Sequence, residues 1–168
     1  MRRRSAGRTA AGLAAAALTA LAGCGGMDVA RDPRPLAVDY EFGRAQACGP
    51  GEGPYRMRLA EMSRRSPRVR VGGVPAGAAA LAVEMVDLDL AGFDHGGGRV
   101  PLAPGARGEA VIPEGALGDW MGPCPPTGSD HRYELRVRAL DAAGRPLAGG
   151  AATRACCRRF EGTAAGGT

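Results

Sequence analysis

Histidine is scarce in this chain, and both copies stand in segments where they could do chemistry. The two are His95 and His131. An imidazole can gain a proton near neutral pH and carries ring N–H donors, so it suits acid–base, metal or anion chemistry. His131 stands two residues before Tyr133, whose hydroxyl can also donate. His95 is followed by Gly96, Gly97 and Gly98, which indicate either a close backbone approach or a mobile rim and leave its position loosely defined.

These residue types also suit two other chemistries. Two histidines and an aspartate could bind Zn²⁺, but the sequence has no closely spaced ligand pair. Cys124 with His131 could form a thiol nucleophile, although flanking prolines and the exported location inferred below favour a disulfide. The sequence contains neither a phosphate-cradling loop of the nucleotide-binding kinds nor a nucleophile-elbow serine. We therefore expect no metal and no cofactor.

A stiff loop followed by a strand must position His131 and Tyr133. Residues 122–128 hold three prolines and two glycines, which exclude a helix or a central strand. From Tyr133 through Ala139, apolar and charged residues alternate, which is typical of a half-buried strand. Tyr133, Leu135, Val137 and Ala139 are expected to face inward. The same parity places His131 on that side, at the inner rim of a sheet.

This loop and strand resemble a known family. Gly122-Pro123-Cys124-Pro125-Pro126, a short glycine-containing spacer and His131-Arg132-Tyr133 are similar to the signature of the phosphatidylethanolamine-binding proteins. The bacterial branch of that family is usually called Raf-kinase-inhibitor-like. The alternative is a proline turn that only starts a strand.

Upstream segments extend the resemblance over roughly residues 66–141. Ser66-Pro67 and Val74-Pro75-Ala76-Gly77 follow the family order, and residues 81–90 form an apolar run typical of a strand covered on both faces. Where the family has Asp-Pro-Asp-Ala-Pro, this chain has Asp87-Leu88-Asp89-Leu90-Ala91. Both acids are kept and both prolines are lost, so the path of this loop is open.

The resemblance implies a small anion pocket. It would combine Asp87, His95, His131 and Tyr133, with a wall formed by Gly122, Pro123, Cys124, Pro125 and Pro126. A carboxylate would repel an anion, so Asp87 is interpreted as the group that orients a histidine. The implied ligand is phosphate-like or a phospholipid headgroup. Taken singly, each residue could instead cap a turn, bond a loop carbonyl or lie exposed.

The first 23 residues have the features of an export signal. Four arginines precede an Ala/Leu-rich run that ends in Leu21-Ala22-Gly23-Cys24, the pattern of a bacterial lipoprotein signal. Cys24 would then receive a diacylglyceryl group; the alternative is an ordinary signal peptide cleaved nearby. Removing residues 1–23, with four Arg and no acid, lowers the formal net charge from +5 to +1. A nucleic-acid partner therefore loses its main support.

Four cysteines remain when Cys24 is set aside: Cys48, Cys124, Cys156 and Cys157. They allow three complete pairings. Exported relatives often carry one cysteine before the Ser-Pro segment and one in the proline loop, and this resemblance implies Cys48–Cys124. Cys156 and Cys157 could pair elsewhere, bridge each other or stay free.

Many short strands separated by Gly/Pro turns predict an all-β protein. The resemblance implies an antiparallel β-sandwich of the phosphatidylethanolamine-binding type with at most short helices. The expected organisation is a signal over 1–23, a tether over 24–35, the β domain over 36–161 and a disordered tail over 162–168. The expected function is non-catalytic binding of an anion or phospholipid headgroup, exported and lipid-anchored at the cell membrane. The alternatives are a module that regulates a protease or kinase-like partner and, last, a hydrolase.

Overall fold

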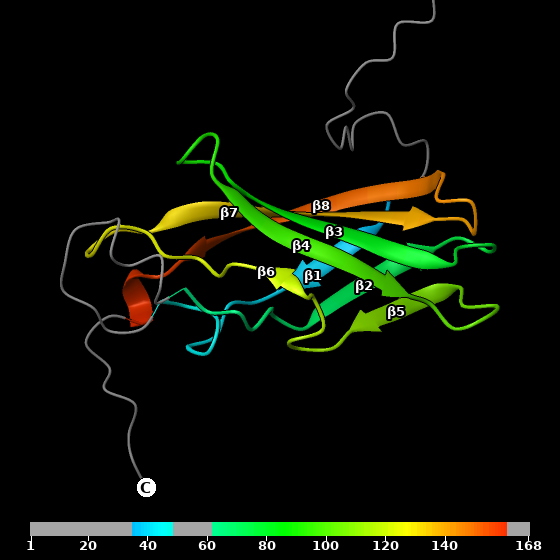
Figure 1. The fold of residues 1–168 in the computed structure, drawn as a ribbon, viewed down its shortest axis with the longest axis horizontal. Helices are drawn as coiled ribbons and strands as arrows, with labels where there is room; N and C mark the ends of the chain where they lie inside the picture. The colour runs from blue at the N-terminus through cyan, green and yellow to red at the C-terminus, as the bar shows by residue number, and fades with distance from the viewer. Residues whose placement is uncertain (1–34, 49–61, 161–168) are drawn as a thin grey trace, which may run out of the picture.

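The computed structural model describes residues 35–48 and 62–160. The predicted signal, the tether apart from Pro35, and the tail lie outside these residues, so those boundaries stay predictions. Within the described part, the chain forms two antiparallel sheets and one 3₁₀ turn, at Arg158–Phe160 (Figure 1). The prediction of an antiparallel β-sandwich is confirmed.

The smaller sheet has the order β1-β2-β5, with β1 at Ala37–Tyr40, β2 at Val69–Val74 and β5 at Gly108–Ile112. The larger sheet has the order β6-β4-β3-β7-β8. Its strands are β3 (Ala80–Asp87), β4 (Asp94–Pro101), β6 (Asp119–Trp120), β7 (His131–Leu140) and β8 (Pro146–Cys156).

The core forms between the two sheets, from side chains that alternate along each strand. The predicted inward set of β7 is confirmed, since Tyr133, Leu135, Val137 and Ala139 are each 0% exposed. Tyr40, Val69, Val71 and Ile112 face them from the smaller sheet and are also buried. Burying each such side chain contributes roughly 1.5–3 kcal/mol, which fixes the register of both sheets.

The start of β1 crosses to the larger sheet and joins the two layers. Pro35 bridges to Gly149 of β8, and the Leu36 N–H donates to the Gly149 carbonyl at 2.8 Å. A Cβ on the next residue, Gly150, would lie 2.2 Å from the Leu36 carbonyl oxygen. Only glycine permits this approach, which explains a glycine pair in the middle of a strand.

The prediction for residues 81–90 was wrong in one respect. β3 alternates buried and half-buried positions, so the core covers only one of its faces. The other face carries Ala82, Glu84 and Val86 opposite Arg138, Arg136 and Glu134 of β7. The long arginine and glutamate stems half-bury this outer face and make an apolar run compatible with a one-sided strand.

Candidate functional site

The predicted site residues meet at one end of the larger sheet. Asp87 ends β3, His95 is the second residue of β4, and His131 begins β7. β3 lies between the other two strands and pairs with both, with Asp87 opposite Tyr133 and Val86 opposite Asp94. The end of an antiparallel strand lies beside the starts of its neighbours, so segments far apart in the sequence come together at this end (Figure 1).

Asp87 orients His131. The His131 Nδ1 lies 2.8 Å from Asp87 Oδ2, while Asp87 Oδ1 accepts the backbone N–H groups of Asp89 and Leu90 at 2.8 and 3.0 Å. A carboxylate that accepts these bonds requires a proton on His131 Nδ1, and Nε2 is then the ring nitrogen that is not bonded to Asp87. The Asp87 side chain is only 2% exposed, whereas that of His131 is 15% exposed.

His95 is the deepest polar member of the cluster, and the expectation that its position is loosely defined was wrong. It is 1% exposed, and its Nδ1 lies 2.8 Å from the Met121 carbonyl oxygen. Its Nε2 lies 3.8 Å from Asp87 Oδ2 and makes no hydrogen bond with any described residue. Burial lowers the pKa of His95 below its ordinary value, and the Met121 bond and the Asp87 charge oppose that shift in part.

The glycines after His95 explain why the site end of β4 is held so closely. A Cβ on Gly97 would lie 2.0 Å from the Val83 carbonyl oxygen of β3, and one on Gly96 would lie 2.1 Å from that of Asp119 of β6. Of the two possibilities that the glycine run left open, close backbone approach is therefore the one observed. It brings β4 against both neighbours and fixes His95.

Tyr133 separates the two histidines. Its ring is edge-on to His95 at a centroid distance of 5.3 Å and stacked with His131 at 6.3 Å. Phe93 lies on the other side of His95 at 4.6 Å. All four predicted pocket residues are thus neighbours, and His131 is the member that reaches the surface.

The proline loop is anchored by backbone contacts. Residues 122–125 are buried and Pro126 is exposed. The Gly122 N–H donates to the Ser63 carbonyl at 2.7 Å, and the Cys48 N–H donates to the Pro123 carbonyl at 3.2 Å. The loop reaches His95 through Met121, the residue just before it. Its role as a ligand wall stays a prediction.

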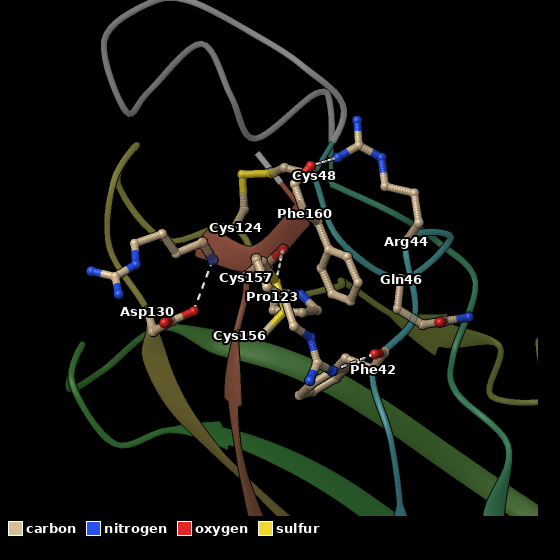
Figure 2. The surroundings of a disulfide bond; sticks show 12 residues. Phe42, Arg44, Gln46, Cys48, Pro123, Cys124, Asp130, Cys156, Cys157 and Phe160 are labelled. Atoms are coloured by element: carbon tan, nitrogen blue, oxygen red, sulfur yellow. Dashed lines mark hydrogen bonds between the residues drawn. A yellow bond between two sulfur atoms is a disulfide. The ribbon is translucent and has the colours of Figure 1, made fainter. Parts of the chain in front are cut away.

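Two disulfides lie beside this loop. Cys48–Cys124, the pairing that the resemblance implied, has a Cα–Cα distance of 5.1 Å. Of the possibilities left open for Cys156 and Cys157, the structure has the bridge between the two neighbours. Figure 2 shows both bridges near Pro123, whose carbonyl oxygen lies 3.9 Å from Cys157 Sγ. Cys48 and Cys124 also cluster with Met62, Phe93 and Met121, so the first bridge supports two residues that contact His95.

Two contacts of the site were not predicted from the sequence: the pairing of Asp89 with Arg132, and the hydrogen bond between His95 and the Met121 carbonyl. Asp89 accepts the Arg132 backbone N–H and, at 2.7 Å, its guanidinium. The Arg132 hydrogen bond holds the pKa of Asp89 down at about 2. The outward position of Arg132 in the alternation was a signal for a surface ion pair, but its partner on another strand was not visible. Nothing in the sequence marked the Met121 carbonyl, because any residue carries one.

The described residues also bear on other kinds of site. Two surface hollows of about 430 and 560 Å³ lie over the smaller sheet and its adjoining loop, away from the histidine cluster; both include Asp39, Arg68 and Arg70. In the part of the chain that the structure describes, no three His, Cys, Asp or Glu side chains are grouped to hold a metal ion. None of its helices has the length and apolar character needed to cross a bilayer.

The described residues thus form an antiparallel β-sandwich with an Asp–His–His–Tyr cluster at one sheet end. The family model described as phosphatidylethanolamine-binding protein matches residues 54–165. The chain belongs to the phosphatidylethanolamine-binding protein family.

Two bacterial crystal structures are similar to the chain. One is Escherichia coli YbcL, described as a new member of the mammalian PEBP family, with 19% identity, a TM-score of 0.48, and coverage of 73% of this chain and 96% of YbcL. The other is the phosphatidylethanolamine-binding protein homologue CT736 from Chlamydia trachomatis, with 19% identity, a TM-score of 0.44, and coverage of 73% and 97%. No curated protein matched the chain.

Membership of the family sets the broad kind of activity. Its members are in general binding and regulatory proteins rather than enzymes, and the family is known for phospholipid and anion ligands. The fold accordingly supports a binding role.

Proposed function

We propose that this protein binds a phosphate-like anion or a phospholipid headgroup, without catalysis, at the end of the larger sheet. The observation that carries the proposal is the pair formed by Asp87 and His131. A buried carboxylate holds one ring nitrogen of a partly exposed histidine at 2.8 Å, so the other nitrogen is presented in a fixed direction. When His131 is protonated, this second nitrogen becomes a pre-oriented N–H donor, which reduces the ordering cost of binding a small anion.

Thermal denaturation with added phosphate or phosphoethanolamine tests this proposal. A ligand that binds only the native state raises its stability, by about 2.7 kcal/mol at a hundredfold excess over Kd. His131→Ala should abolish the shift in midpoint, because it removes the partly exposed ring. Arg107→Gln is the matched control, since Arg107 is an exposed cation on the β4–β5 connection at the other end of the molecule (Figure 1). An unchanged shift in His131→Ala would contradict the proposal.

The proposed location is a cell membrane after export, with the protein held there by a lipid on Cys24. The support is the run Leu21-Ala22-Gly23-Cys24 after an apolar segment, in residues that the structure does not describe. Cys24→Ser should release the protein into the soluble fraction or leave the signal uncleaved. Intact-mass analysis of the native protein that finds an unmodified Cys24 would disprove lipidation.

A second candidate is a module that regulates a protease or kinase-like partner. One observation favours it: Arg68 and Arg70 are both exposed, line the two hollows and make no ion pair with a described residue. An acidic segment of a partner would complement them. If phosphate and phosphoethanolamine leave the stability unchanged, this candidate replaces the first.

A further inference from the structure

The Nε2 atom of His95 is buried within the Asp–His–His–Tyr cluster. It belongs to a residue that is 1% exposed, it has no hydrogen-bond partner among the described residues, and it lies 3.8 Å from Asp87 Oδ2. Buried polar atoms are rarely left without a partner, because the loss of hydration is not repaid. An orphaned atom at a binding site therefore points to a group that the ligand supplies.

The hydrogen bond on the other side of the ring defines which group is needed. The Met121 carbonyl can only accept, so Nδ1 of His95 carries the proton and the neutral ring presents a lone pair at Nε2. Asp87 Oδ2 is also an acceptor. This oxygen already accepts from His131, so it cannot satisfy Nε2, and a ligand that brings no proton would leave Nε2 without a partner.

The groups around His95 favour the neutral form of its ring. Desolvation lowers its pKa and outweighs the opposing influences of the Met121 bond, Asp87 on β3 and Asp94 on its own strand. His131 on β7 lowers the pKa further when it is charged. The remaining neighbours, Phe93 and Tyr133, contact it through their rings.

We infer that the site binds a phosphoryl group together with one proton, shared between His95 Nε2 and a ligand oxygen. His95 would then determine specificity, favouring phosphoryl groups that can hold a proton over anions of the same shape that cannot. This inference rests on the proposed anion-binding function and names the kind of anion. Sulfate is the informative comparison, because it has the size and charge of phosphate but stays deprotonated at any pH at which proteins fold.

The proton balance has two routes with one outcome. A phosphate monoanion brings its own P–O–H, which donates to the Nε2 lone pair. When the dianion binds, one of its oxygens takes a proton from solvent, and the resulting P–O–H donates to the same lone pair; sulfate is too weak a base to take this proton. In both routes the complex holds one proton more than the free protein plus the dianion, so the ligand should bind less tightly as the pH rises above its second pKa, which is about 6 for a phosphate monoester and higher for inorganic phosphate.

Calorimetric titration of the purified protein with inorganic phosphate and with sulfate tests the inference. We expect phosphate to bind roughly tenfold or more tighter than sulfate, which is the cost of one unsatisfied buried acceptor. Phosphate titrations at about pH 8, in buffers of different ionisation enthalpy, should reveal uptake of about one proton per phosphate. Equal affinities without proton uptake, or tighter binding of sulfate, would overturn the inference and leave the anion pocket standing. If neither anion binds, the proposed function itself fails.

The two sources of a phosphoryl ligand differ in where the donor comes from. A lipid headgroup is a phosphodiester, which carries no proton on its phosphoryl oxygens near neutral pH. It can donate a hydrogen bond only through the ammonium group of ethanolamine. Tighter binding of glycerophosphoethanolamine than of glycerophosphocholine would support the inference with a lipid as the source. Binding of phosphate and its monoesters alone would support it with a soluble ligand. Equal binding of the two diesters would contradict the need for a donor.

Variants and a spectroscopic readout keep the inference falsifiable. His95→Gln supplies amide N–H groups and should narrow the difference between phosphate and sulfate, whereas Arg107→Gln should leave it unchanged. If the buried substitution prevents folding, ¹⁵N NMR of the histidine rings in the unaltered protein decides. Nε2 of His95 should carry no proton in the free protein or with sulfate. Only phosphate should shift its ¹⁵N resonance, because the phosphoryl O–H then donates a hydrogen bond to Nε2. A proton on Nε2 in the free protein at neutral pH would refute the inference.

Discussion

Removal of the Cys48–Cys124 disulfide should destabilise the domain severely, and the sequence distance that it spans sets the magnitude. The two cysteines are 76 residues apart. On the chain-entropy model, a cross-link that closes such a loop destabilises the unfolded state by about 4 kcal/mol. Because domains of this size are stable by only about 5–15 kcal/mol, the variant with both Cys48→Ala and Cys124→Ala should lose a large share of its stability.

The second disulfide provides an internal control. Cys156 and Cys157 are adjacent, with a sequence separation of 1, so their bridge closes no loop of consequence. The variant with both residues changed to alanine should therefore lose much less than the first variant, although both side chains are buried.

The assay is urea denaturation of the unaltered protein and of both double variants. The slope of the unfolding free energy against urea concentration shows whether a variant also changes the unfolded state. Equal losses in the two variants, or a loss of less than about 1 kcal/mol in the first, would refute the loop-entropy reasoning. The first variant should also weaken anion binding, because Phe93 and Met121 pack on Cys48–Cys124 and contact His95.

Three further predictions concern the site itself. Asp87→Asn should lower the free energy of unfolding by roughly 1–3 kcal/mol. An amide N–H would then face His131 Nδ1, so the proton of the neutral His131 ring should move from Nδ1 to Nε2. ¹⁵N NMR would detect this change, and an unchanged tautomer would contradict the orienting role of Asp87. Folding lowers the pKa of His95, so the unfolded chain binds more protons than the folded one below about pH 6.5. The free energy of unfolding should therefore fall as the pH drops below about 6.5, by at most about 1.4 kcal/mol per pH unit. The difference in stability between the unaltered protein and His95→Gln measures the contribution of His95, and a difference that does not change with pH would contradict this prediction. Gly97→Ala should lower the free energy of unfolding by about 1–3 kcal/mol or more, because its methyl would lie 2.0 Å from the Val83 carbonyl oxygen. Gly118→Ala is the control and should be nearly neutral, because open space surrounds that position. Similar denaturation midpoints for the two variants would argue against the close approach of β3 and β4.

Much of the framework was predictable because it depends on local patterns. Period-two alternation placed the inward residues of β7 correctly, and it needs only the sequence of one strand. The proline loop was recognisable because its residue types restrict the backbone directly. His131 and Tyr133 followed from both, since the parity of the strand extends back to the loop.

The position of His95 could not be predicted in the same way. A glycine run is compatible with a mobile loop or with close approach, and the choice depends on the Val83 and Asp119 carbonyls, which are far away in the sequence. The Met121 bond that fixes the ring comes from a backbone atom. Long-range backbone contacts leave no pattern in side-chain types, so the most deeply buried polar residue of the site was the one least defined by sequence.

The β3–β4 loop shows how the site keeps its geometry without the prolines that its family motif contains. A proline at position 88 would have no N–H, but Leu88 donates one to the Arg132 carbonyl at 2.8 Å and so extends the pairing of β3 with β7. Asp87 Oδ1 accepts the next two N–H groups, and Asp89 in turn holds the backbone N–H of Arg132 at 2.7 Å. These hydrogen bonds therefore restrain the loop backbone, as the pyrrolidine rings of the family's prolines would. Because Asp87 both orders this turn and orients His131, the shape of the loop and the direction of the His131 ring depend on one carboxylate.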